Sequence, residues 1–196
     1  MQVRSLILGA LLLLVPACAS EATTDPVESD IVTASDSAIQ GKLRGILKDV
    51  TFTSESDYGY QVIEGEAVAD RSKRLSTAVV RQKLGAVVKA KSSDHRDILP
   101  SSCRAERLNV SSAIAEGEAA QVPSPDDDNY TYARHDKQLM IALKYMRQQL
   151  KGVVGYTFGT DASGNQDELG TVVFVYVGIS KTTGKLIAIM TEAVWT

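Results

Sequence analysis

The chain has 196 residues, of which 44% are hydrophobic and 23% charged, an ordinary balance for one globular domain with a real core. Its formal net charge is −3, which argues against direct binding of nucleic acid, because neutralising phosphates requires clustered lysine and arginine. The same acidic balance suits a protein partner with a basic surface.

The N-terminus has the pattern of an export signal. Arg4 provides a short basic start, and the apolar run from Leu6 to Val15 is too short to span a bilayer as a helix. Residues 1–17 are therefore predicted to be a signal peptide that is removed from the mature protein.

Cys18 is the predicted lipidation site. Val15-Pro16-Ala17-Cys18 resembles a bacterial lipoprotein cleavage box, which implies cleavage before Cys18 and a lipid on its sulfur. A plain secretory signal cut near Ala17 or Ser20 is the alternative. Residues 18–36 are rich in small and acidic side chains and predict a flexible tether. We expect an exported protein, held to a membrane in the periplasm or at a cell surface.

The folded domain is predicted over residues 37–196. Apolar residues recur at helical spacing from Ile39 to Val50, and Ser35 or Asp36 suits the N-cap. A strand is predicted from Tyr60 to Glu66. The apolar positions from Leu75 to Leu84 then predict a second helix, which Gly85 should end.

The middle of the chain has the weakest pattern. Val87-Val88 and the stretch from Glu106 to Val110 could each form a short strand. Ala115 to Pro125 is small, acidic and proline-containing, so we expect a mobile loop there. A strong helix should follow the acidic run Asp126–Asp128, with an apolar face from Leu139 to Leu150 and Gly152 at its end.

The last part of the chain predicts the architecture. After a strand at 153–160, two apolar runs at 172–177 and 186–190 flank the turn Lys181-Thr182-Thr183-Gly184. Adjacent strands without polar alternation indicate a sheet that is covered on both faces. The predicted fold class is α+β, a three-layer α/β/α sandwich with a mostly antiparallel central sheet and a C-terminal hairpin near its centre.

Catalytic and metal-binding patterns are weak. The two histidines, His95 and His135, have no motif around them, and Cys103 is interpreted as a small half-buried residue rather than a nucleophile. A metal site would need His or Cys at set spacings, so we expect no metal and no cofactor of the protein's own. We therefore expect a binding module, not an enzyme.

One polar segment stands out, Ser54-Glu55-Ser56-Asp57-Tyr58, on a predicted loop between a helix and a strand. By composition alone it is a solvated turn. It resembles the Ser-Glu-Ser-Asp-Tyr segment of the nuclease A inhibitor family, proteins that block a sugar-non-specific, metal-dependent DNA/RNA endonuclease. The C-terminus is also similar to that family's ending, in Val175-Tyr176-Val177-Gly178, in the 181–184 turn and in the strand that runs to Thr196.

The resemblance implies a mechanism of inhibition. In the family, the glutamate of the motif and the carboxyl-terminal threonine face the nuclease active site and its magnesium, which here are Glu55 and the carboxylate of Thr196. A hard divalent cation takes oxygen ligands, and both groups are ionised at neutral pH with unperturbed pKa values near ~4.3 and ~3.5. Ser54 and Asp57 belong to the same expected partner-binding segment.

The chain departs from the family in two places. Gly59 stands where the family usually has proline. The family also uses a central tryptophan at the interface, where this chain offers Tyr130 and Tyr132, and Trp195 is its single tryptophan. These aromatic residues complete the expected partner-binding set. The alternative function is a surface lipoprotein of the same fold that binds a different protein or ligand.

Overall fold

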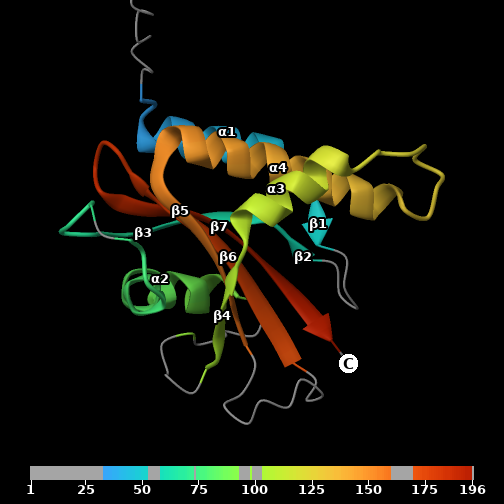
Figure 1. Ribbon diagram of the computed structural model, residues 1–196. Helices are drawn as coiled ribbons and strands as arrows, with labels where there is room; N and C mark the ends of the chain where they lie inside the picture. Colours follow the sequence, from blue (N-terminus) through green and yellow to red (C-terminus); the bar gives the residue numbers. More distant parts are fainter. Residues whose placement is uncertain are drawn as a thin grey trace, which may run out of the picture. The chain divides into compact units, whose positions relative to one another are not determined.

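The computed structural model describes residues 33–52, 58–72, 74–92, 98, 103–159 and 170–195. Their framework is an antiparallel sheet whose strands are β3 Gln61–Ala67, β4 Ala105–Leu108, β5 Leu150–Phe158, β6 Gly170–Ser180 and β7 Lys185–Trp195. The strands lie in the order β3-β7-β6-β5-β4, so the hairpin made by β6 and β7 lies at the centre (Figure 1). The predicted C-terminal hairpin is confirmed.

Helices cover both faces of this sheet (Figure 1). Helix α2, Thr77–Lys91, packs on one face through Val80, Leu84 and Val88, against the side chains of Val175, Val177 and other strand residues. Helices α1, Asp36–Ile46, and α4, Tyr130–Gln149, pack on the opposite face. Helix α3, Val110–Ala119, joins the same layer by packing against α4. The predicted three-layer sandwich is therefore confirmed.

The apolar runs in β6 and β7 explain why helices cover both faces of the sheet. In β7, Leu186 and Ala188 belong to the α2-side core, whereas Ile187 and Ile189 belong to the core beneath α1 and α4. Successive side chains of a strand point to opposite faces, so a run that is apolar at every position is buried on both. All four residues are fully buried.

Helix α1 starts where the sequence predicts it. The side chain of Ser35 accepts a hydrogen bond from the backbone N–H of Ala38 and forms the N-cap. Asp36 also reaches the β6–β7 turn, where its carboxylate accepts hydrogen bonds from the hydroxyls of Ser180 and Thr183. The start of the first helix is thereby fastened to the central hairpin.

The prediction that Gly85 ends the second helix is wrong. Helix α2 continues through Gly85 to Lys91, so the possible strand at Val87-Val88 is wrong as well. Gly85 is buried and does not have the positive φ that a helix-ending glycine uses. Val88 continues the buried stripe of Val80 and Leu84, because these positions share one face of a helix.

Two further predictions about the middle of the chain are wrong. Residues 115–119 lie in α3 rather than in a loop, because alanine-rich sequence favours helix and Asn109 caps the helix by accepting from Ser111 and Ser112 N–H. The long helix α4 ends at Gln149, before Gly152. Gly152 instead has φ 60° at a shift of register within β5. The short strand predicted near 106–110 is confirmed as β4.

Candidate functional site

The segment 53–57 is bracketed by a small second sheet. Strands β1, Thr51–Phe52, and β2, Tyr58–Gly59, pair antiparallel, with Phe52 opposite Tyr58. Ser54, Glu55 and Asp57 lie outside the described residues, but both ends of their segment are positioned by this pair.

Aromatic packing holds the β1 side of the hairpin. The Phe52 ring stacks on the Phe174 ring of β6, with centroids 4.8 Å apart, and meets the His135 ring of α4 edge-on at 5.2 Å. Such ring pairs contribute about 0.5–1.5 kcal/mol beyond the area they bury. Phe52 is therefore wedged between the sheet and the helix layer.

A hydrogen bond holds the β2 side. The hydroxyl of Thr191 in β7 donates to the backbone carbonyl of Tyr58 at 3.1 Å. Met190 is the last residue of β7 that pairs with β3, at Gln61. The hairpin lies beside the part of β7 that follows Met190. It is a separate two-stranded sheet that packs beside β7 beyond the region where β3 pairs.

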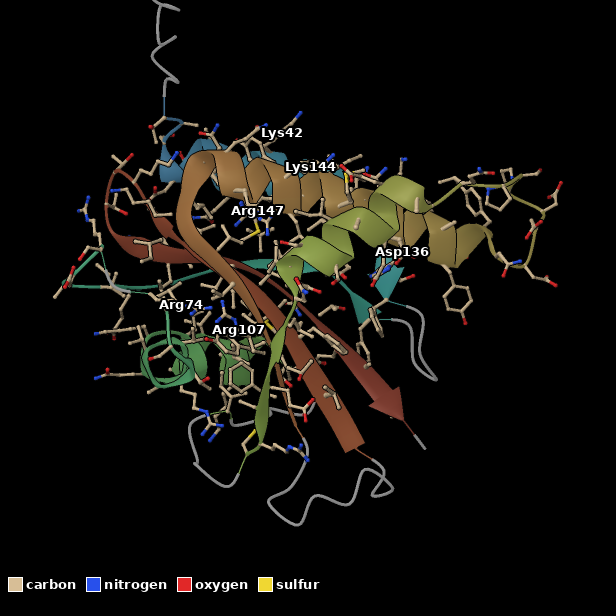
Figure 2. All side chains as sticks on the ribbon, in the orientation of Figure 1. Lys42, Arg74, Arg107, Asp136, Lys144 and Arg147 are labelled. Atoms are coloured by element: carbon tan, nitrogen blue, oxygen red, sulfur yellow. The ribbon has the colours of Figure 1, made fainter. Side chains whose placement is uncertain are left out.

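A partly buried chain of polar side chains lies beneath the hairpin. The Tyr60 hydroxyl is 2.7 Å from His135 Nε2, and His135 Nδ1 is 2.9 Å from a carboxylate oxygen of Asp136. A proton on Nδ1 satisfies both contacts, since His135 then donates to Asp136 and accepts from Tyr60. Burial raises the pKa of Tyr60 well above its usual value of 10, so the phenol stays protonated and can donate. Asp136 is labelled in Figure 2, between α4 and β1.

Strand β7 contacts the hairpin at Thr191 and continues beyond it. Thr191 pairs with Phe174, and the strand continues to Trp195, which pairs with Gly170. At a rise of about 3.4 Å per residue, Trp195 is about 14 Å along the strand from Thr191. The strand therefore continues well past the residue that the hairpin contacts. The side chain of Trp195 and the whole of Thr196 lie outside the described residues.

The first turns of α4 precede the histidine that contacts the hairpin. Tyr132 is 55% exposed and one turn before His135, and Tyr130 opens the helix with a partly exposed side chain. Both tyrosines precede His135, the α4 residue that contacts Phe52. Of the predicted partner-binding residues, the structure describes Tyr130 and Tyr132 on the helix that contacts the hairpin, and the backbone of Trp195 on the strand that contacts it.

His135 and Cys103 lie on opposite faces of the sheet, so they do not form a catalytic pair. Cys103 packs against the α2-side core, whereas His135 contacts Phe52 and Tyr60 on the α4 side. Within the described parts of the chain, no group of three His, Cys, Asp or Glu side chains could hold a metal ion. None of the described helices is long and apolar enough to cross a membrane. Cys18 and His95 lie outside the description.

Sequence reasoning missed the residues that position the hairpin, which are Phe52, Tyr60, His135, Phe174 and Thr191. The available signal in the sequence was the aromatic residues on both sides of the polar segment. Large aromatic side chains next to a polar segment indicate that its two ends pack against the domain. Their partners are 75 or more positions away in the sequence, as with Tyr60 and His135, so no local pattern identifies them.

The sequence matches no protein-family model and no curated protein.

Proposed function

We propose that the protein inhibits a magnesium-dependent, sugar-non-specific nuclease by inserting acidic groups into the nuclease active site. The observation that carries the proposal is the fastened hairpin: Phe52 and Tyr58, at the two ends of the Ser54–Asp57 segment, are held by Phe174 and Thr191. Fixing the two ends of a segment lowers the conformational entropy that the segment loses on binding, which favours an inhibitory role.

The chemistry of the segment suits such a target. Glu55 supplies a carboxylate, which can take the place of a substrate phosphate oxygen next to a divalent cation. In this proposal the Thr196 carboxylate makes a second approach from the end of β7, and Ser54 and Asp57 contact the surrounding cationic surface. Tyr130, Tyr132 and Trp195 supply aromatic contact area, which dominates many interfaces.

The proposal is tested by inhibition of a purified nuclease of this class. The full chain, in mild detergent, is added to the nuclease with magnesium, and plasmid cleavage is followed. We expect stoichiometric inhibition, with Glu55→Gln weakening it about tenfold or more because a buried charge-assisted contact is lost. A Gly-Ser extension after Thr196 should weaken it as well.

A matched acidic variant controls for the change of net charge. Glu118→Gln removes an exposed carboxylate on α3, a helix that lies outside the hairpin, and should leave inhibition unchanged. Equal inhibition by the native chain, Glu55→Gln and the extended chain would refute the assigned mechanism. Absence of any binding to such nucleases would favour the alternative, a lipoprotein that binds another partner.

We also propose that Cys18 carries a lipid that holds the domain at a membrane facing the periplasm or the cell exterior. The support is the Val15-Pro16-Ala17-Cys18 box that follows an apolar run. Mass spectrometry of the protein from a bacterial membrane fraction should show an acylated N-terminal Cys18. Recovery of a Cys18→Ser variant in the soluble periplasmic fraction supports the anchor, and unchanged membrane retention contradicts it.

A further inference from the structure

The sheet of the described residues ends at β4, on the opposite edge from β3. The backbone N–H of Gly159 donates to the Arg104 carbonyl, so the pair 104–159 is hydrogen-bonded. In an antiparallel ladder, bonded and non-bonded pairs alternate, which makes Glu106 and Leu108 the residues that bond to β5. The N–H and C=O groups of Ala105 and Arg107 consequently point outward, away from the sheet.

Hollows follow this strand on both sides. On the α2 side, cavities of about 630 and 350 Å³ share Thr77 and Ala105 in their walls and so form one continuous groove between α2 and β4. On the opposite side, a cavity of about 350 Å³ lies between Leu108, the start of α3 and Arg147 of α4. An added strand sends alternate side chains to opposite faces, so it could fill the hollows on both sides.

The walls of these hollows are basic, although the whole chain is acidic. Arg74 and Arg107 line the 350 Å³ part of the α2-side groove, and neither guanidinium makes a hydrogen bond or ion pair within the described parts of the chain. Arg81 and Arg104 line the 630 Å³ part, and Arg147 lines the cavity on the other side. Figure 2 shows Arg147 near the α3 end of β4, with Arg107 and Arg74 closer to α2.

Part of this charge is already engaged. Arg104 pairs with Glu106 at 2.7 Å, and Arg147 donates to the Ser111 hydroxyl at 2.9 Å. Arg81 donates to the Cys103 carbonyl and lies over the Phe158 ring. These contacts hold the cationic walls in place, and Arg74 and Arg107 remain the two side chains with full capacity for an incoming carboxylate.

Short and charged edge strands commonly protect a sheet against adding further strands. Here the charges around the edge are arginines apart from Glu106, which is paired with Arg104, so the edge repels a second copy of itself and accepts an acidic strand. The outward N–H and C=O groups complement a peptide backbone, whereas nucleic acid offers no matching alternation of donors and acceptors. Charge and hydrogen bonding thus favour the same kind of ligand.

We propose that the outer edge of β4 binds an extended acidic peptide of a partner protein, which adds a strand to the sheet and places its carboxylates beside Arg74 and Arg107. The site lies at the opposite edge of the sheet from the β1–β2 hairpin. It is therefore independent of the nuclease proposal, and a peptide can occupy it while the hairpin is engaged.

The test uses a fluorescein-labelled peptide of alternating acidic and apolar residues, Glu-Val-Glu-Val-Glu-Val-Glu. Its binding to the full chain in mild detergent is followed by fluorescence anisotropy. Ala105→Pro removes only one outward N–H and leaves the β5 ladder intact, and proline is tolerated at such edge positions. We expect Ala105→Pro and Arg107→Glu each to weaken binding about tenfold, through a lost backbone bond and a reversed charge.

The controls separate strand addition from general attraction of anions. Lys42→Glu reverses an exposed charge on α1, away from β4, and should leave binding unchanged. A peptide with lysine in place of glutamate should not bind. In the native chain, hydrogen exchange of the Ala105 and Arg107 amides should slow when the acidic peptide is added, a readout that requires no variant to fold.

Two results would overturn the proposal. Equal affinity of the native chain and a folded Ala105→Pro variant, together with unchanged exchange at Ala105 and Arg107, would exclude backbone pairing. Binding of a single-stranded oligothymidylate at least as tight as that of the peptide, and equally sensitive to Arg107→Glu, would identify a polyanion surface instead of a peptide site.

Discussion

Two tyrosine hydroxyls beneath the α4 layer differ in what they contact. The Tyr60 hydroxyl meets His135 Nε2, whereas the Tyr176 hydroxyl makes no hydrogen bond within the described parts of the chain. Both rings are largely buried, and burial raises the pKa of each phenol. The Tyr60 hydroxyl therefore contributes a hydrogen bond, whereas the Tyr176 hydroxyl contributes none among the described residues, and substituting each with phenylalanine distinguishes the two cases.

Replacing Tyr60 with phenylalanine should destabilise the protein by about 1 kcal/mol or more, because His135 loses its partner in a partly buried position. The free energy of unfolding is measured by urea titration. Tyr132→Phe is the control, since its side chain is exposed and its loss of a hydroxyl should change stability by less than about 0.5 kcal/mol. Equal, negligible effects would show that the Tyr60–His135 contact contributes nothing to stability.

Tyr176 should make the protein sensitive to alkali. Burial, with the nearby carboxylates of Glu116 and Asp136, raises its pKa to about 12, against about 10 in the unfolded chain. Above pH ~10 the unfolded state releases a proton that the folded state retains, so stability is full below that pH and is lost as pH rises toward 12.

The size of this effect follows from the two pKa values. Tyr176 alone should cost about 1.4 kcal/mol of unfolding free energy between pH ~9 and ~11. Tyr176→Phe should remove that part of the loss, measured by urea titration at both pH values. If the native and Tyr176→Phe chains lose the same amount, the phenol of Tyr176 titrates as it does in the unfolded chain.

Among the helices, strands and turns, the sequence pattern predicted correctly those features that depend on neighbouring residues in the chain. The covered strands, the N-cap at Ser35 and the 181–184 turn depend on nearby residues, and the structure contains them. Gly85 and Gly152 were misread because a glycine can end a helix, continue it or form a bulge. Which of these happens depends on tertiary packing, which the sequence pattern does not contain.

The contact of α3 with α4 depends on one glycine. A methyl group added at Gly117 would lie 2.3 Å from Met140 Cβ and 2.4 Å from the Asp136 carbonyl oxygen, so the helices would have to separate. Gly117→Ala should therefore destabilise the protein by about 1–3 kcal/mol despite the higher helix propensity of alanine.

A glycine in an open position of α1 provides the matched comparison. Nothing lies within 4 Å of a methyl group added at Gly41, so Gly41→Ala should stabilise the protein by about 0.5–1 kcal/mol. Thermal unfolding followed by circular dichroism measures both variants. A melting temperature that rises for both would mean that α3 and α4 are not closely packed at Gly117.

For the whole molecule, the sequence predicted the layers but only part of the candidate site. Two apolar runs around a turn are sufficient to predict a covered central hairpin. The hairpin that brackets Glu55 depends on Phe52 reaching Phe174 of β6 and His135 of α4, which are 122 and 83 positions away in the sequence and meet it only in the folded domain. The start of α4 was predicted to contribute tyrosines, but its histidine was not predicted to position β1.

The central hairpin contributes residues to both cores, one on each face of the sheet. Leu186 belongs to the core under α2, and its neighbour Ile187 belongs to the core under α1 and α4. Because both are fully buried, Leu186→Ala and Ile187→Ala should each cost about 2–5 kcal/mol of unfolding free energy. Because both cores pack on the same sheet, truncating either side chain should lower the stability of the whole domain.

This expectation distinguishes one cooperative unit from two stacked layers. In both variants, urea unfolding followed by far-ultraviolet circular dichroism and by tyrosine fluorescence should give coincident, single transitions at a lower midpoint. The exposed Val122→Ala is the control and should leave the midpoint unchanged. A first transition that melts only one helix layer in Leu186→Ala or Ile187→Ala would show that the layers unfold separately. In Ile187→Ala, such a transition would release the β1–β2 hairpin together with the α4 layer while the α2 layer persists, whereas in Leu186→Ala it would release the α2 layer.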